Sequence, residues 1–250
     1  MGKIFLEKDV LQAAFKKFDV LYIDFEAQYK HTIQHIEELK QLPQIRDFYH
    51  IALPIALRNA VSVLQPKWIC WEEESKDLWV RDMPKDSINM SNCPFDWFVK
   101  GEEFEEFIIQ FADWYQKKYK TSIACGVGIR TDESLNRFRT IAFQDRKITY
   151  TTKIKYHDKY LDVYNFYPIY DWRTEDIWGA VSKFDFKFNY IYELMYKNGL
   201  GIHEQRLCQP FGDDQKNGLN QFKALEYETW GKVLNRVNGV NFGNIYCKTT

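Results

Sequence analysis

Two kinds of hydrophobic pattern alternate over the first 55 residues of the chain. Apolar residues recur at helical spacing over 8–18, and a continuous apolar run, DVLYIDF, follows at 19–25. Residues 27–42 return to helical spacing, and a second apolar run, YHIALPI, occupies 49–55. Continuous apolar runs of this length are typical of strands buried in a parallel sheet. The order strand, helix, strand therefore predicts a parallel sheet with helices on its faces.

The middle of the chain combines a stretch of mixed polarity with a further strand and helix. Residues 66–100 contain several turn residues, and we expect an excursion with short strands there. Residues 101–119 show one apolar stripe with acids early and lysines late, which predicts a helix aligned with its own dipole. A strand that runs into glycines is expected at 121–129, and a helix at 135–143.

The last third of the chain predicts a hairpin followed by helices. The segments KITYTTKIKY and LDVYNFYPIY alternate in polarity on either side of HDK, as expected of two paired strands. We expect a helix to begin with Thr174 as its N-cap, because two acids follow it. Another helix is expected at 189–198 with Gly199 at its C′ position, and the last helices lie within 218–238.

These elements predict an α/β protein with one domain over residues 1–250. Its sheet core is expected at 19–170, with the excursion inside it, and a helical part is expected at 171–250. Hydrophobic residues make up 45 % of the chain and charged residues 28 %, which supports a packed core. Aromatic residues make up 17 %, enough to leave rings for stacking on a base.

The net charge and the spacing of the cysteines limit the classes of partner and the cellular compartment that we expect. The formal net charge is −1, which disfavours a broad DNA-binding face and leaves a DNA partner only local basic patches such as KKYK. No apolar run reaches 18 residues and the N-terminus lacks a signal-peptide core, so we expect a cytoplasmic protein without a membrane span. The five cysteines form no C-x-x-C pair, which predicts reduced thiols and no iron–sulfur cluster.

The segment GVGIRTDESLNRFR, residues 126–139, is a candidate anion-binding turn. A strand that ends in glycines before a helix exposes backbone N–H groups, which favour a bound phosphate or sulfate. An arginine at the turn can add a planar guanidinium. The candidate residues are Gly126, Gly128, Arg130, Asp132, Glu133 and Arg137. The alternative is an ordinary loop, in which the acids complement the helix dipole and the arginines form surface ion pairs.

Three other groups of residues compete for a functional role. Asp24 and Glu26 end the first strand and can hold a ribose or a metal, although capping a helix is the favoured role for them. His203 and Arg206 lie near the thiol of Cys208 and can lower the pKa of that thiol, but a solvated loop is the favoured interpretation. The pair His31 and His35 has metal-ligand spacing, but the H-E-x-x-H pattern is missing and we expect no metal site.

Several motifs recur together in the order of a known family. They are YIDFEAQY, ALPIALRNAVS, WICWE, GIRTDESLNRFR, YPIYDWRTEDIW and RLCQPFGDDQKNGL. This set, over roughly residues 19 to 243, resembles the phosphoadenosine phosphosulfate reductase superfamily. It looks closest to the branch of phosphoadenosine phosphosulfate sulfotransferases, or immunoglobulin-binding regulator A type coactivators of prophage genes.

The resemblance implies an adenine nucleotide alpha-hydrolase-like fold, a doubly wound parallel sheet with an added hairpin and C-terminal helices. It places Gly128, Arg130, Glu133 and Arg137 at the phosphate or sulfate end of a nucleotide, either ATP or phosphoadenosine phosphosulfate. It places Asp24, and less firmly Glu26, near the nucleoside. Further candidate pocket residues are Asp171, Trp172, Arg206 and Cys208.

The sequence also departs from this family. No S-G-G-K-D-S phosphate loop precedes DVLYIDF, and the E-C-G-x-H pattern with its catalytic cysteine is not evident, so no catalytic residue is assigned. The segment with the loop could be cut from this sequence, supplied by a partner chain, or replaced by repacking. Two hypotheses follow: a sulfonucleotide reductase- or transferase-like nucleotide-binding protein, or a non-catalytic regulatory protein that acts through a protein partner, a second copy of itself or DNA.

Overall fold

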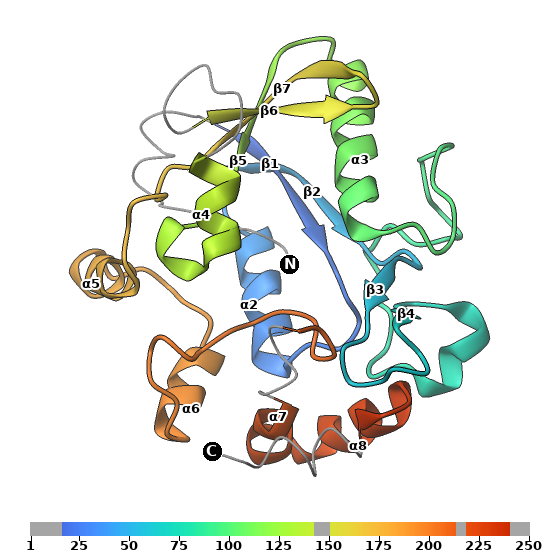
Figure 1. Ribbon diagram of the computed structural model, residues 1–250, viewed down its shortest axis with the longest axis vertical. Coiled ribbons are helices and arrows are strands. Elements are labelled where there is room, and N and C mark those ends of the chain that lie inside the picture. The colour runs from blue at the N-terminus through green and yellow to red at the C-terminus, as the bar shows by residue number, and fades with distance from the viewer. Residues whose placement is uncertain (1–16, 143–150, 214–218, 241–250) are drawn as a thin grey trace. The chain divides into compact units, whose positions relative to one another are not determined.

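The computed structural model describes residues 17–142, 151–213 and 219–240, and it shows a mixed α/β protein (Figure 1). The described chain forms two compact units. Unit 1 takes residues 17–104, 188–213 and 219–240, and unit 2 takes residues 105–142 and 151–187. The expectation of one domain over 1–250 stays a prediction.

Unit 1 is built on a parallel pair of strands with a helix between them in the sequence. Its elements are β1 (Phe18–Ile23), α2 (Lys30–Lys40), β2 (Ile45–Ile51), β3 (Ala56–Arg58), β4 (Lys67–Ile69), the 3-10 helix η1 (Glu73–Leu78), α6 (Ile191–Lys197), α7 (Leu219–Leu225) and α8 (Tyr227–Arg236). β1 and β2 pair in parallel, and β3 and β4 pair antiparallel. The β-α-β prediction is confirmed. β2 starts before the expected residue 49, and its first half was not predicted because that half is polar and exposed.

The core of unit 1 forms where the apolar strand ends meet the later helices. Tyr22 and Ile23 of β1 and Ile51 of β2 are buried. The ring of Tyr29, just before α2, stacks on Phe222 of α7 with centroids 3.8 Å apart. Full burial of a side chain of this size contributes about 1.5–3 kcal/mol to the free energy of folding. The stack therefore ties the segment before α2 to helix α7.

Unit 2 contains the long helix and the hairpin. Its elements are α3 (Phe104–Tyr119), β5 (Ile123–Gly126), the 3-10 helix η2 (Thr131–Glu133), α4 (Leu135–Ala142), β6 (Thr151–Tyr156), β7 (Lys159–Phe166) and α5 (Thr174–Phe184). β7 is the middle strand, antiparallel to β6 and parallel to β5. The hairpin around HDK is confirmed. Ile141 of α4 forms a buried cluster with Ile129 and Tyr167.

Most helix predictions agree with the structure, with two local exceptions. The helix expected at 8–18 lies mainly outside the described residues, and its last residue, Phe18, instead begins β1. The N-cap of α5 is Arg173, not Thr174, because the N–H of Arg173 is bonded to the carboxylate of Asp176 at 2.8 Å. Gly199 follows α6 with φ of +92°, as expected of a C′ glycine.

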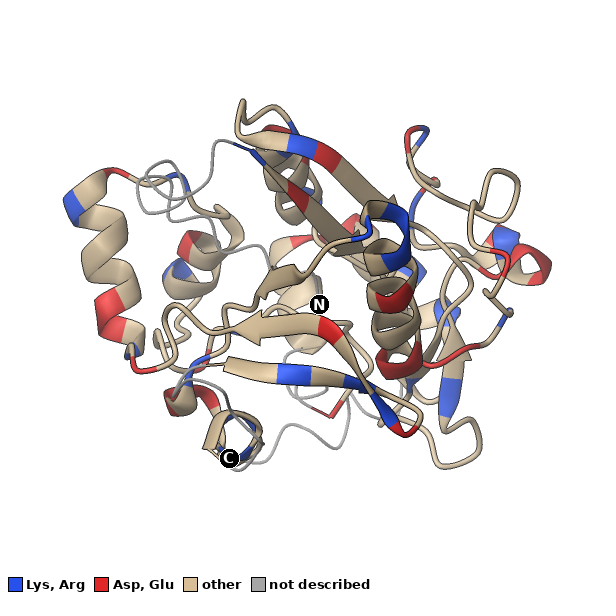
Figure 2. Ribbon diagram, turned by 90° about the horizontal axis from the view of Figure 1, so that it is seen from above, with Lys and Arg blue, Asp and Glu red and all other residues tan. Residues whose placement is uncertain are grey.

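Charged residues of both signs are interspersed along the elements of each unit (Figure 2). Among the described helices, none is long and apolar enough to cross a lipid bilayer.

Candidate functional site

Two carboxylates are completely buried where β1 ends. Asp24 and Glu26 have no exposed surface. An isolated charge in such a position would be strongly unfavourable, so each carboxylate needs a cation and hydrogen-bond donors. Both have them, and the partners come from segments far away in the sequence.

Asp24 is held by a histidine and an arginine. Its Oδ2 lies 2.8 Å from Nε2 of His50, at the end of β2, and also accepts a hydrogen bond from Arg81 of the excursion. Its Oδ1 accepts the backbone N–H of Glu26 at 2.9 Å. Burial alone raises the pKa of Asp24, but the charge of Arg81 and the contact with His50 outweigh it and hold that pKa below its ordinary value.

Glu26 is the centre of a second buried ion pair. Its two carboxylate oxygens accept hydrogen bonds from Nε and Nη2 of Arg236 in α8, at 2.6 and 2.9 Å. The same carboxylate accepts the backbone N–H of Trp71 at 2.8 Å and that of Val80 at 3.1 Å. Arg236 also donates to the carbonyl oxygen of Ile69 at 2.7 Å. One buried glutamate thus joins β1, the excursion and α8.

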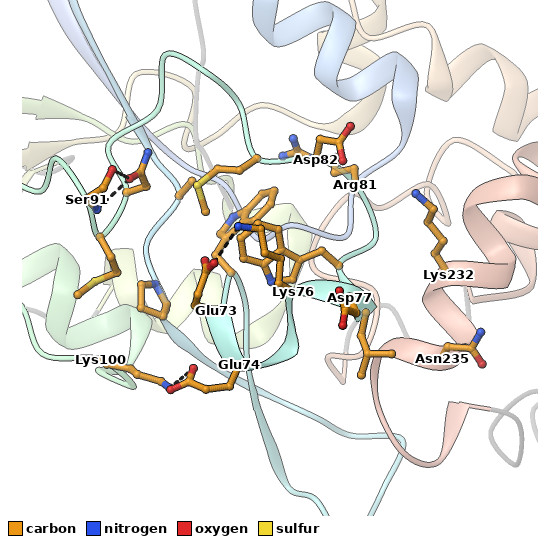
Figure 3. Close-up of a pocket in the computed structure, with 18 residues that line it drawn as sticks. Glu73, Glu74, Lys76, Asp77, Arg81, Asp82, Ser91, Lys100, Lys232 and Asn235 are labelled. Carbon is orange, nitrogen blue, oxygen red and sulfur yellow. Dashed lines mark hydrogen bonds and ion pairs between the residues drawn. The ribbon is translucent and has the colours of Figure 1, made fainter.

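A cavity of about 1080 Å³ opens beside these ion pairs, at the carboxyl end of β2 (Figure 3). Ala52 and Pro54, which follow β2, form part of its wall. The apolar wall continues with Trp71, Leu78, Trp79, Met83 and Met90. The charged wall consists of Lys76, Arg81, Lys100, Lys232, Glu73, Glu74, Asp77 and Asp82. In open α/β sheets, ligands bind at this edge of the strands.

Arg81 connects the buried network to the cavity. Its side chain is 19 % exposed and lines the cavity, while its Nε donates to the carbonyl oxygen of Glu26 at 3.0 Å. Its guanidinium lies 4.9 Å from the centre of a Trp71 ring, a cation–π geometry. These contacts fix the guanidinium in one orientation before any ligand binds.

Helix α8 supplies the opposite charged wall. Arg236 anchors the helix through Glu26, and Lys232 and Asn235 line the cavity from the same helix. Both of these side chains belong to exposed residues. The helix therefore presents one ammonium and one amide to the cavity from a fixed support.

The predicted anion-binding turn lies in unit 2, and several of its polar groups already form hydrogen bonds within that unit. β5 ends at Gly126 and the helical segments follow, as expected. However, the N–H of Val127 donates to the Phe166 carbonyl at 2.9 Å, and the N–H of Thr131 donates to the Tyr170 carbonyl at 2.8 Å. Gly126 is needed for space, because a Cβ there would lie 3.1 Å from the ring of Phe166. These two N–H groups are therefore not available to an anion.

Arg130 is also engaged within unit 2. Its Nη1 donates to the Trp172 carbonyl at 3.4 Å and to Oγ1 of Thr174 at 3.3 Å. The carboxylates of Asp132 and Glu133 each lie 3.5 Å from its guanidinium. The motifs GIRTDES and DWRTEDIW are thus brought together. The ion pairs match the alternative of a surface loop, and a bound sulfate or phosphate there stays a prediction.

The remaining candidates lie outside the cavity wall. Gly128 is buried in unit 2, where Arg137 pairs with Glu133 at 3.8 Å and Asp171 is exposed. Arg206 and Cys208 belong to unit 1, but neither lines the cavity. Asp24 and Glu26 have no surface that a ligand could touch, so in this structure they hold Arg81 and Arg236.

His50, Arg81 and Arg236 were not predicted from the sequence as site residues. For Arg236 a signal was present, because it shares the buried face of α8 with Trp230 and Val233 at helical spacing. An arginine on an apolar stripe needs a buried acid as its partner. Arg81 lies in an irregular segment, and no periodic pattern distinguishes it.

Comparisons with known proteins give no activity. Residues 199–250 match a family model described as a domain of unknown function, DUF3440. The uncharacterized protein YbdN of Escherichia coli (strain K12) is 38 % identical over 239 residues, which cover 92 % of this chain and 56 % of YbdN. The chain thus spans a little over half the length of this curated relative. No solved structure matches the chain.

Proposed function

We propose that unit 1 binds an adenine nucleotide, ATP or phosphoadenosine phosphosulfate, in the cavity at the carboxyl end of β2. The observation that carries the proposal is the guanidinium of Arg81, which the buried carboxylate of Asp24 holds and which belongs to a partly exposed residue of the cavity wall. A guanidinium held in this way binds a phosphate or sulfate without first losing conformational freedom.

The chemistry of the wall fits the three parts of a nucleotide. Trp79 is half-buried and, with Met90, offers an apolar surface for the base. Asp77 and Asp82 can accept hydrogen bonds from ribose hydroxyls. The acidic residues of the wall also balance the charge of its lysines, so the cavity does not attract every anion. Arg81 and Lys232 then take the anionic end.

The same proposal includes the finer fold, a doubly wound parallel sheet of the adenine nucleotide alpha-hydrolase type. It is supported by the parallel pairing of β1 with β2 around α2, and by the parallel pairing of β5 with β7. The family resemblance points the same way. No catalytic residue is assigned, and the proposal is one of nucleotide binding.

Isothermal titration of the folded protein with each nucleotide tests this function. We expect one binding site, and we expect Lys232→Ala to weaken it about tenfold, the effect of losing a charge-assisted hydrogen bond. The matched control is Lys223→Ala, an exposed lysine on α7 that does not line the cavity, which should bind as the wild type does.

Two results would overturn the proposal. One is the absence of heat at millimolar concentrations of either nucleotide while circular dichroism shows a folded protein. The other is equal affinity of the two lysine variants. Either result favours the regulatory alternative, in which the chain acts through a protein or DNA partner.

A further inference from the structure

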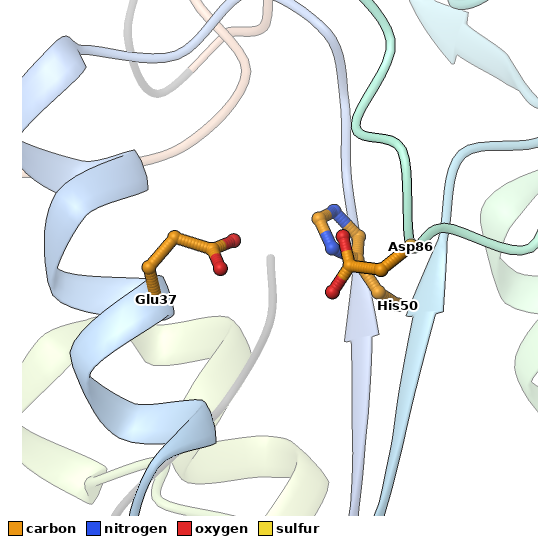
Figure 4. A group of neighbouring side chains, drawn as sticks. All are labelled: Glu37, His50 and Asp86. Carbon is orange, nitrogen blue, oxygen red and sulfur yellow. The ribbon is translucent and has the colours of Figure 1, made fainter.

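A second group of polar side chains lies away from the cavity wall, between α2 and β2. One ring nitrogen of His50 and one carboxylate oxygen each of Glu37 and Asp86 lie within 4.8 Å of one another (Figure 4). Glu37 extends from α2 toward His50, and Asp86 lies beside the imidazole ring. Both carboxylates belong to exposed residues, whereas His50 is only 2 % exposed.

The backbone explains why these residues meet. β2 continues into an isolated parallel bridge between Ile51 and Ile88. The N–H of Ile88 donates to the His50 carbonyl at 2.7 Å. This bridge fixes the excursion against β2 and brings Asp86, two residues earlier, next to the imidazole.

One ring nitrogen of His50 orients the imidazole, and the other is available to a ligand. Nε2 lies 2.8 Å from the carboxylate of Asp24, which also accepts a hydrogen bond from the guanidinium of Arg81, so we assign the ring hydrogen to Nε2 as the donor to that carboxylate. Nδ1 then has a lone pair. Within the part of the chain that the structure describes, this buried Nδ1 has no hydrogen-bond partner. A carboxylate behind a histidine is the usual support of a metal-binding imidazole, because it fixes the tautomer and raises the basicity of the ligand nitrogen.

A second buried group beside the ring also lacks a partner. The hydroxyl of Tyr22 is buried without a hydrogen bond among the described residues. Its ring lies 5.1 Å from that of His50. A water molecule on a bound ion would give this hydroxyl a partner.

A cation already lies between the two carboxylates. Nζ of Lys40 is 2.7 Å from Oε1 of Glu37 and 2.7 Å from Oδ2 of Asp86. This ammonium neutralises the acids but has no lone pair and cannot be a ligand of a metal. It would have to move away when a divalent ion binds, and its charge competes with that ion.

We propose that His50 Nδ1, Glu37 and Asp86 form a binding site for a divalent transition-metal ion, with Asp24 orienting the histidine. One imidazole and two carboxylates suit Mn²⁺ or Zn²⁺ and leave positions for water. Mg²⁺ is a poor match, because it prefers oxygen ligands in a regular octahedron. The exposed carboxylates can close on the ion by rotating their side chains, while His50 stays in place.

Mn²⁺ is the best probe because it has little affinity for the five cysteines of the chain. Titration of the folded protein is followed by the loss of the electron paramagnetic resonance signal of free Mn²⁺. We expect one site per chain, displaced by Zn²⁺ but not by an equal concentration of Mg²⁺. Glu37→Gln and Asp86→Asn should each weaken Mn²⁺ binding at least about tenfold.

Two further variants separate a metal site from a purely structural cluster of ion pairs. Glu38→Gln changes the neighbouring exposed glutamate of α2 and should leave Mn²⁺ affinity unchanged. Lys40→Gln removes the competing charge and should tighten Mn²⁺ binding about thirtyfold, the effect of one unit charge on a doubly charged ion about 4 Å away in water. The proposal is overturned if the free Mn²⁺ signal is unchanged at millimolar metal, or if Glu37→Gln and Glu38→Gln bind alike. It is also overturned if Lys40→Gln binds no more tightly than the wild type. Because these readouts involve no nucleotide, their outcome is independent of the proposed function.

Discussion

Replacing Arg236 with methionine tests how much the buried ion pair with Glu26 stabilises unit 1. The substitution keeps an unbranched side chain of similar length on α8, and it removes the guanidinium. Three hydrogen bonds are lost, two to Glu26 and one to the carbonyl of Ile69. The helix itself should persist, because methionine is a good helix former.

The cost comes mainly from the glutamate that is left behind. Glu26 has no exposed surface, and among the described residues its carboxylate without Arg236 keeps only the backbone N–H groups of Trp71 and Val80. Removing one partner of a buried ion pair costs about 3–5 kcal/mol in the free energy of unfolding. At a urea dependence of about 3 kcal/mol per molar, this cost moves the unfolding midpoint down by about 1 to 2 M.

Urea unfolding followed by tryptophan fluorescence measures this shift, since Arg236 lies 5.0 Å from the centre of a Trp68 ring. Lys223→Ala, at an exposed position of α7, serves as the control and should change stability by less than about 0.5 kcal/mol. The double variant Glu26→Gln/Arg236→Met should be less destabilised than the sum of the two single variants, because it leaves no unpaired charge. A loss below about 1 kcal/mol for Arg236→Met, or strict additivity, would refute the reasoning.

Two further predictions concern a helix end and an acidic group. Gly199→Ala should cost about 1 kcal/mol and lower Tm by about 2–4 °C in a thermal scan, because Gly199 has φ of +92°. An unchanged Tm would show that alanine adopts this conformation without strain. The lowered pKa of Asp24 means that its charge stabilises the fold fully above about pH 4, and that this contribution is lost as the pH falls through the folded-state pKa. Asp24→Asn should therefore be less stable at pH 7 and lose less stability than the wild type between pH 4 and pH 3. Urea midpoints with parallel pH dependence would contradict this.

The regular elements could be predicted from the sequence because their patterns are local. The apolar runs of β1 and β2, the stripe of α3 and the alternation of β6 and β7 each report the periodicity of one backbone conformation. The expected strand at 49–55 begins earlier, at Ile45, because the first half of β2 is polar and half-exposed. A run of apolar residues marks the buried part of a strand, not its whole length.

The site could be predicted only in part, because its contacts are distant in the sequence. Asp24 was singled out as a strand-end acid, but its partner Arg81 lies 57 residues away and Glu26 is 210 residues from Arg236. A motif shows which residue types are present and not which of them are buried. Asp24 and Glu26 were therefore expected to face a ligand. In the structure both carboxylates are buried: Asp24 pairs with Arg81, which lines the cavity, and Glu26 pairs with Arg236, which is buried.

Asp24 gives the cavity and the candidate metal site a shared component. Its Oδ2 contacts both Nε2 of His50 and the guanidinium of Arg81. A metal ion on Nδ1 would draw electron density from the imidazole and make Nε2–H a stronger donor to that oxygen, leaving less of its charge for Arg81. Arg81 would then present more of its charge to an anion in the cavity. The two proposed ligands would therefore favour one another, and because binding free energies are reciprocal, each would raise the affinity for the other by the same factor.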